Sequence, residues 1–270
     1  MAKQGTATKR PRRERGSLNP DDIVAGAFEL AEEISIDNLS MPLLGKHLGV
    51  GVTSIYWYFR KKEELLNAMT DRALRQYAFE TPFIEAGDWR DTLRKHAQTM
   101  RQTFLGNPIL CDLILIRSAL SEKAARLGGK QTERVIASLV EAGFSLENAV
   151  ETYSRVQLHV HGFVVLQRLS DKNRELSPES TAYYENVIID PETTPLLAEA
   201  AAMGYHSGAP DDRNFEHGLD SILDHASRLL EGGEQERKSS PARRGSRPTA
   251  KKAAPTAKKA AKPRTRAAAE

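Results

Sequence analysis

The residues best suited to chemistry form one short run, in which the aromatic residues 56–58 (Tyr-Trp-Tyr) are followed by the basic residues 60–62 (Arg-Lys-Lys). Tyrosine hydroxyls, the indole N–H and the basic groups are all hydrogen-bond donors, which suits phosphate oxygens. The alternative is an aromatic plug in a helical core. Three consecutive helical positions fan over about 200°, however, so the three rings cannot all face one core. The run therefore favours contact with DNA.

Catalytic and metal-binding patterns are missing from the sequence. It has no glycine-rich phosphate loop after a strand, no G-x-S-x-G elbow and no H-E-x-x-H motif. His159 and His161 would point about 200° apart on a helix, and His217 and His225 lie two turns apart. The single Cys111 has no partner for a disulfide or a metal site. We expect neither an enzyme nor a bound metal or cofactor.

The elements that position the aromatic run are two short helices joined by a turn. Ser40 is a natural N-cap, and Leu43, Leu44 and Leu48 are expected on one helical face before Gly49 ends the helix. A second helix over about residues 52–58 would turn Ile55 and Phe59 inward. This pattern predicts a helix-turn-helix, whose second helix enters the major groove.

The spacing L-x-M-x-x-L-x-x-x-L-G-V-x-x-x-x-I-Y-x-Y-F-x-x-K-x-x-L-L at residues 39–66 resembles the DNA-binding domain of the TetR family of transcriptional regulators. The resemblance implies that Thr53 and Ser54 contact bases or phosphates, that the aromatic run grips the backbone and braces the helix, and that Lys62 meets a phosphate. Gly51 stands where a Ser or Thr cap is usual, and Tyr58 replaces a frequent histidine. The full set of expected DNA-binding residues is Ser40, Lys46, Thr53, Ser54, Tyr56, Trp57, Tyr58, Lys62, Arg12, Arg13 and Arg15.

Charge is strongly divided along the 270 residues. Residues 1–15 carry +5, residues 237–270 carry +11, and the segment between them carries −13. The first arm, 1–16, has almost no apolar side chain and is expected to be disordered; Arg12, Arg13 and Arg15 in it could reach DNA. The tail, 233–270, is rich in Lys, Ala and Pro and is also expected to be disordered. Each arm could instead be a solubilising appendage, and the tail could fold back on the acidic segment.

Helical patterns cover the rest of the chain. Asn19 and Pro20 start a helix before the helix-turn-helix, and another helix is expected over residues 62–80. Further helices are expected over residues 89–106, 108–120 and 215–230, and two more are expected between them, one ending at Gly143 and one beginning at Ser145. A long irregular connection is expected at 171–210, with one short helix at 196–203. The sequence thus predicts an all-α chain, with a DNA-binding domain at 17–80 and a helical effector-binding and dimerisation domain at 81–232.

The section 156–169 is apolar on nearly every side, so it must be buried on all sides. A second subunit is the expected cover, and we expect this helix and the last helix to form a homodimer surface. The TetR resemblance further implies a small-molecule cavity in this domain. The candidate lining residues are Met100, Phe104, Ile114, Arg117, Gln157 and His161.

These patterns predict a ligand-responsive repressor that binds a palindromic operator in double-stranded DNA as a homodimer. No apolar run approaches the roughly 20 residues of a membrane span, so we expect a cytoplasmic, nucleoid-associated protein with no membrane partner. The alternative function is a weakly sequence-specific, nucleoid-associated DNA binder anchored by its basic tail. A third class, a small-molecule or redox sensor without a DNA role, would apply only if neither the full chain nor the chain without its tail bound DNA.

Overall fold

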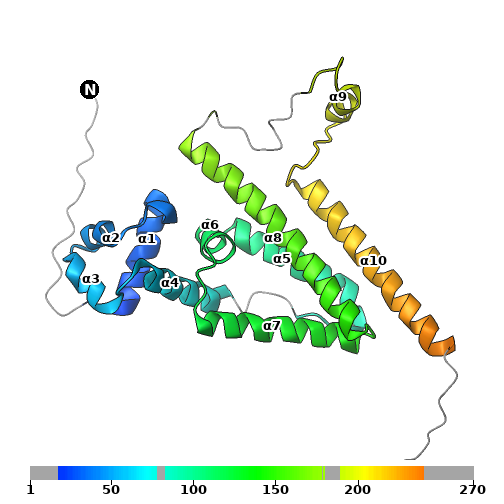
Figure 1. Cartoon of the computed structure of the whole chain (residues 1–270), viewed down its shortest axis with the longest axis horizontal. Helices are drawn as coiled ribbons and strands as arrows, with labels where there is room; N and C mark the ends of the chain where they lie inside the picture. The colour runs from blue at the N-terminus through cyan, green and yellow to red at the C-terminus, as the bar shows by residue number, and fades with distance from the viewer. Residues whose placement is uncertain (1–17, 78–82, 178, 180–188, 240–270) are drawn as a thin grey trace, which may run out of the picture.

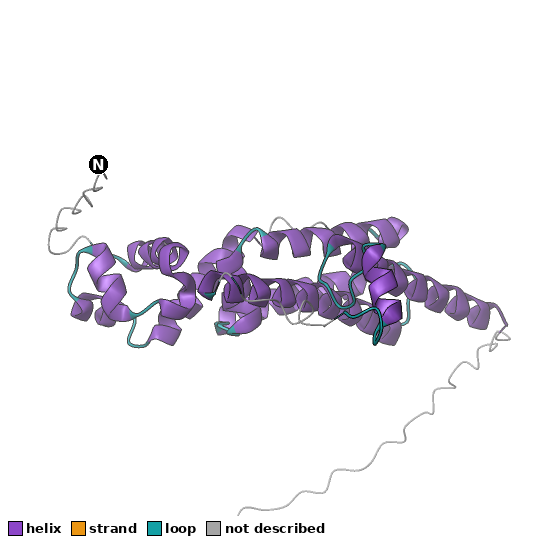
Figure 2. Cartoon of the chain, turned by 90° about the horizontal axis from the view of Figure 1, so that it is seen from above, coloured by secondary structure: helices purple, strands orange, loops and turns teal. Residues whose placement is uncertain are grey.

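The computed structural model describes residues 18–77, 83–177, 179 and 189–239. Within these ranges the chain is built from helices and connecting loops, with no strand (Figures 1 and 2). The molecule is elongated: α1 to α4 lie at one end, and the C-terminal end of α10 lies at the other. The elements are α1 (Pro20–Asn38), α2 (Met41–Leu48), α3 (Val52–Tyr58), α4 (Lys62–Tyr77), η1 (Ala86–Asp88), α5 (Trp89–Leu105), α6 (Pro108–Cys111), η2 (Asp112–Ile116), α7 (Glu122–Glu141), α8 (Leu146–Leu176), α9 (Pro195–Ala202) and α10 (Asp212–Ser239).

The N-terminal unit packs α1 to α4 around one apolar core. Asn19 caps α1 by accepting a 2.8 Å hydrogen bond from the Asp22 amide, and Pro20 begins the helix, as the sequence predicts. Ile23 and Ile55 are fully buried in this core. Gly26 lets α2 approach α1 closely, since a Cβ at that position would lie 2.4 Å from a methyl carbon of Leu48. The core thus fixes the orientation of α2 and α3 relative to α1.

The body is a layer of long helices centred on α8. Val156 and Val164 are buried between α8 and its neighbours, and α10 runs beside α8 (Figure 1). Arginines of α5 pair with carboxylates of α10 in antiparallel register: Arg94 with Asp220 at 2.5 Å and Arg101 with Asp212 at 2.6 Å. The apolar stripe of α10, with Phe215, Leu219 and Leu223 fully buried, packs in the core of the body, and these ion pairs add contacts with α5.

The expected single helix at 108–120 is wrong. Helix α6 ends at Cys111, the π-helical segment η2 follows, and Ser118 has a φ of 50°. The wider π-helical turn lets neighbouring residues face different cores: Cys111 is buried in the body, whereas Leu113 is buried in the N-terminal unit. This junction joins the two halves of the chain.

Two smaller expectations, the shared face of Leu43 and Leu44 and the start of the irregular connection, are wrong, and a kink in α1 was not anticipated. Leu43 is exposed and does not share the buried face of Leu44. Helix α1 is kinked at Ser35, whose φ of 67° and ψ of 152° cost roughly 1–3 kcal/mol for a residue other than glycine. Helix α8 continues to Leu176, so the irregular connection begins later than residue 171. Polar residues of its last turns are held by the pair of Arg168 with Glu175 inside the helix and by the pair of Lys172 with Asp37 across the junction. The short helix expected at 196–203 is present as α9.

No helix in the described part of the chain is both long enough and apolar enough to cross a membrane.

Candidate nucleic-acid interface

The turn between α2 and α3 has the geometry that the sequence predicts. The Ser40 hydroxyl accepts a hydrogen bond of 3.4 Å from the Leu43 amide and caps α2. Gly49 ends α2 with a left-handed φ of 69°, and the Val50 amide then donates a 2.9 Å hydrogen bond to the Gly45 carbonyl. Gly51 precedes α3 without a side-chain cap, which agrees with the missing Ser or Thr at that position.

Helix α3 has one buried face and one exposed face. Ile55 is fully buried and Phe59 nearly so, which anchors the helix on the N-terminal core. Thr53 and Ser54 are exposed, as are Tyr56 (44% exposed) and Trp57 (77% exposed). An indole so fully exposed contributes little to packing, so its position favours contact with a ligand.

Tyr58 has a different environment from its two aromatic neighbours. It is half-buried, its ring packs edge-on against Trp57 at 4.6 Å, and its hydroxyl donates a 2.7 Å hydrogen bond to the carbonyl oxygen of Leu18. The side chain therefore braces α3 against the segment that enters α1. The resemblance implied both gripping and bracing for the aromatic run, and the geometry of Tyr58 matches the second.

Basic groups surround this exposed face. Lys46 on α2 is exposed, and so are Arg60 and Lys61 in the turn after α3. Lys62 begins α4 and is partly buried; burial, and next the positive charge of Arg117, lower its pKa. The Arg60 amide donates a 2.7 Å hydrogen bond to Glu64, which orders the turn that carries these cations. Arg12, Arg13 and Arg15 lie outside the described residues.

The expected effector-site residues fall into two groups. Met100 and Phe104 on α5 and His161 on α8 pack on the core of the body or beside it, and the Phe104 and His161 rings meet edge-on at 5.9 Å. Gln157 lies one turn earlier on α8 and is half-buried. Burial lowers the pKa of His161, which favours its neutral form among apolar neighbours.

Ile114 and Arg117 lie elsewhere, at the junction with the N-terminal unit. Ile114 packs on the core of that unit, and Arg117 is ion-paired with Asp37 of α1. The structure therefore does not bring these two together with the α5 and α8 candidates. Their neighbours were hidden from sequence reasoning because the π-helical segment changes the direction of every side chain after Cys111.

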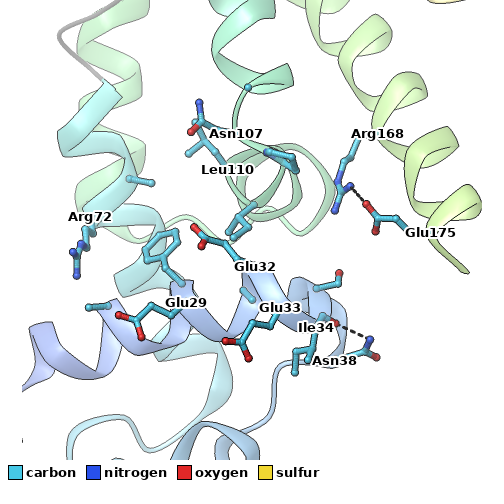
Figure 3. Close-up of a pocket in the computed structure, with 18 residues that line it drawn as sticks. Glu29, Glu32, Glu33, Ile34, Asn38, Arg72, Asn107, Leu110, Arg168 and Glu175 are labelled. Atoms are coloured by element: carbon cyan, nitrogen blue, oxygen red, sulfur yellow. Dashed lines mark hydrogen bonds and ion pairs between the residues drawn. The ribbon is translucent and has the colours of Figure 1, made fainter. Parts of the chain in front are cut away.

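A groove of about 870 Å³ at this junction was not anticipated from the sequence (Figure 3). Its walls come from α1, α4 and α6, with Arg168 and Glu175 of α8 at one edge. The α1 wall carries three acidic side chains, Glu29, Glu32 and Glu33, among apolar ones such as Phe28 and Ile34. No sequence motif marks the groove, since it forms only where two units meet.

The histidine pair behaves as expected from helical spacing. His159 stacks on Phe215 of α10 with ring centroids 4.9 Å apart, and its Nε2 lies 2.8 Å from the Phe215 carbonyl oxygen. It therefore fastens α8 to α10, while His161 faces Phe104. Within the described ranges, no group of three or more His, Cys, Asp or Glu side chains is arranged to hold a metal ion.

Comparison with known proteins agrees with this geometry. A family model for bacterial regulatory proteins of the tetR family matches residues 23–69, and one for the tetracyclin repressor-like C-terminal domain matches residues 81–226. A helix-turn-helix transcriptional repressor of Mycobacterium tuberculosis is 65% identical over 228 residues, which cover 84% of this chain and 87% of that protein. The class A tetracycline repressor of Escherichia coli transposon 1721 is 28% identical over 210 residues, covering 77% and 89%.

Solved structures show the same fold. A possible TetR family regulator from Streptomyces coelicolor aligns with a TM-score of 0.60 at 21% identity and covers 78% of this chain and 100% of its own. TetR from Acinetobacter baumannii aligns with a TM-score of 0.57 at 24% identity, covering 79% and 98%. Both family models match this chain, and α3, the recognition helix of the helix-turn-helix, exposes one face. This chain therefore belongs to the TetR family, whose members are helix-turn-helix transcriptional regulators and not enzymes.

Proposed function

We propose that this chain is a homodimeric repressor that binds a palindromic operator through α3 and releases it when a small apolar or amphipathic molecule binds the body. The observation that carries the proposal is the division of α3, where Ile55 is fully buried while Trp57 and Tyr56 lie exposed beside basic groups. Such a helix is fixed in direction by its buried side and free to read DNA with its other side. The similar protein from Mycobacterium tuberculosis is a transcriptional repressor, which supports repression rather than activation here.

A DNA protection experiment on the promoter region of its own gene tests the operator. Purified full-length chain is expected to protect a palindromic segment better than random DNA, and Tyr56→Ala is expected to abolish that preference. Tyr205→Ala is the matched control, because Tyr205 is 48% exposed but lies after α9, away from the N-terminal unit. Equal protection of operator and random DNA by the wild-type chain, unchanged by Tyr56→Ala, would contradict the proposal.

The homodimer follows from apolar side chains that one chain leaves uncovered. Leu158 on α8 is 73% exposed, and Leu166 and Leu169 further along the helix are also exposed. A soluble regulator gains free energy by covering such leucines, and a second copy of α8 and α10 supplies a surface of the same kind. Pairing two chains also supplies the two recognition helices that a palindrome needs.

Effector release is supported by structural neighbours. The ActR protein of Streptomyces coelicolor, at a TM-score of 0.57, was solved with actinorhodin, and a TetR variant of Acinetobacter baumannii, at 0.53, was solved with minocycline. We propose Met100, Phe104, Gln157 and His161 as walls of the corresponding site here. Anisotropy of labelled operator DNA, titrated with minocycline and with actinorhodin as probes, tests release. Phe104→Ala is expected to weaken any response, and an unchanged response would exclude Phe104 from the site.

A second candidate function rests on charge. The tail at 237–270 carries +11, which favours non-specific binding to DNA. A chain ending at Gly232 separates the two functions. If the chain is an operator-specific repressor, the shortened protein keeps its preference for operator over random DNA; if it is a nucleoid binder anchored by the tail, the shortened protein loses nearly all binding to both.

A further inference from the structure

Asp37, in the last turn of α1, is held by two separate segments of the body. Its Oδ2 lies 2.7 Å from the ammonium of Lys172 in the last turns of α8, and its Oδ1 is paired with the Arg117 guanidinium just after η2. The Lys172 side chain is largely buried, and that of Asp37 is about half-exposed. An α1 residue of the DNA-binding unit is thus fixed by both elements that approach it from the body.

One of these two cations, Lys172, is also paired with a buried carboxylate. Asp112 of η2 is fully buried and accepts two hydrogen bonds from Arg168, at 3.0 and 2.9 Å. Lys172 also lies 3.0 Å from Asp112, so one ammonium bridges Asp112 and Asp37. Arg168 further pairs with Glu175 at 3.2 Å, at the edge of the junction groove (Figure 3). Three acids and three bases therefore form one balanced network from α8 through η2 to α1.

The backbone of α1 is strained immediately before this network. Ser35 has a φ of 67°, and its hydroxyl lies 3.5 Å from the Asp37 amide that donates to it. A residue other than glycine keeps such a conformation only where surrounding contacts hold it. Ile36, which is fully buried in the N-terminal core, supplies one such contact, and the paired Asp37 adds a second contact from the body.

We infer that Asp37, Arg117 and Lys172 form an ion-pair latch through which the body sets the angle of the DNA-binding unit. A change in the body that displaces α8 or η2 moves Asp37, and the DNA-binding unit turns with it, because Ile36 and Leu39 on either side of Asp37 are buried in the core of that unit. In a dimer such a turn changes the distance between the two recognition helices and therefore the fit to the operator. The latch thus rests on the proposed repressor function, and it assigns the regulation of DNA binding to these three residues.

The position of Lys62 links the latch to DNA contact. The charges of Arg117 and Asp37 act on the Lys62 ammonium in opposite directions, the first lowering its pKa and the second raising it. Loss of the Asp37 charge would leave Glu63 as the remaining negative charge that offsets Arg117 at Lys62, a proposed phosphate contact. The charges of the latch therefore act on a residue of the DNA-facing surface.

The latch is tested by the distance between the two units, measured by pulsed dipolar spectroscopy on full-length protein. Spin labels are attached at two exposed positions, Glu33→Cys on α1 and Lys130→Cys on α7. The distance between them reports the angle between the DNA-binding unit and the body. Labelled chains are mixed with excess unlabelled chains, so only distances within one chain are measured. The native Cys111 stays unlabelled because it is fully buried, and burial raises its pKa to about 11.

Asp37→Asn is expected to broaden the distance distribution roughly twofold, since it removes both ion pairs at the kink. Lys172→Met is expected to broaden it less, because Arg117 remains paired, and the double variant is expected to match Asp37→Asn. Glu122→Gln is the control, because it breaks an exposed pair with Arg126 inside α7. A distribution for Asp37→Asn as narrow as that of Glu122→Gln would overturn the latch.

Operator binding supplies the second readout. Lengthening the half-site spacing by one base pair, about 3.4 Å, is expected to weaken wild-type binding about tenfold and Asp37→Asn binding much less. An equal loss in both proteins would overturn the regulatory role of the latch. If no variant prefers operator to random DNA, the proposed function fails, while the distance measurement still decides whether the latch exists.

Discussion

The hydroxyl of Tyr58 donates a 2.7 Å hydrogen bond to the carbonyl oxygen of Leu18, which lies 40 residues earlier in the chain. The bond joins the last turn of the recognition helix to the segment just before α1, where the basic arm ends. One side chain therefore couples the orientation of α3 to that of the segment that enters α1 at Leu18. The sequence alone shows Tyr58 only as a third aromatic residue in a row.

Removing this hydroxyl is expected to loosen both elements. Tyr58→Phe keeps the ring and its edge-on contact with Trp57 but should lower the free energy of unfolding by about 0.5–1.5 kcal/mol, the usual net contribution of one hydrogen bond. Urea denaturation measures that change, and operator affinity should fall with it. Tyr205→Phe, at an exposed position in the body, should change neither quantity.

Glycine to alanine substitutions are expected to change the free energy of unfolding in opposite directions at two sites. Gly49 has a φ of 69° and open space where a Cβ would stand, so Gly49→Ala should cost about 1–2 kcal/mol from backbone conformation alone. Gly128 lies inside α7 with equally open space, so Gly128→Ala should stabilise by about 0.5–1 kcal/mol. Thermal unfolding of the two variants compares them directly, and a stabilised Gly49→Ala would show that the turn is not strained.

Local signals predicted the helix ends of the N-terminal unit well because each of these ends is marked by a few adjacent residues. Asn19 with Pro20, Ser40 and Gly49 each mark a helix end through chemistry that needs no distant partner. The division of α3 into Ile55 inward and Trp57 outward follows from helical periodicity with the same certainty.

Long-range contacts decided the features that sequence reasoning missed. The last turn of α1, just after the kink at Ser35, is joined to the last turns of α8 by Asp37 and Lys172, which are 135 residues apart. The π-helical segment forms where Asp112 is buried against Arg168, a pairing that no motif announces. Arg117 was expected in an effector site for the same reason, since its partner Asp37 lies in the other domain.

A charged residue at the centre of the uncovered apolar face of α8 should prevent dimer formation. Leu158→Glu is expected to give a monomer in analytical ultracentrifugation and to weaken operator binding by about 10²-fold or more, because the two half-sites no longer bind as one unit. Leu127→Glu, at an exposed leucine of α7, should leave the mass unchanged. A dimer that persists in Leu158→Glu would place the interface elsewhere.

Lys62 is expected to contribute a phosphate contact at each half-site. Lys62→Met should reduce the slope of the logarithm of operator affinity against the logarithm of salt concentration by about 0.9 for each half-site. The measurement is a salt titration of labelled operator DNA. Lys123→Met on α7 should leave the slope unchanged, and an unchanged slope in Lys62→Met would remove this residue from the DNA contacts.

Two histidines of α8 should make the fold less stable as the pH falls from about 7.5 to 5.5, the range in which histidine titrates. Burial is the main cause that lowers the pKa of both His159 and His161 in the folded chain, so their neutral forms stabilise it above the unfolded value of 6.5. Below that value the unfolded chain takes up more protons than the folded chain, and the free energy of unfolding decreases. His159→Phe can still stack on Phe215 but cannot be protonated, so in urea denaturation it should show a shallower pH dependence than the wild-type chain. His217→Phe, at an exposed site on α10, should keep the wild-type dependence, and an equally steep curve for His159→Phe would assign the effect to other groups.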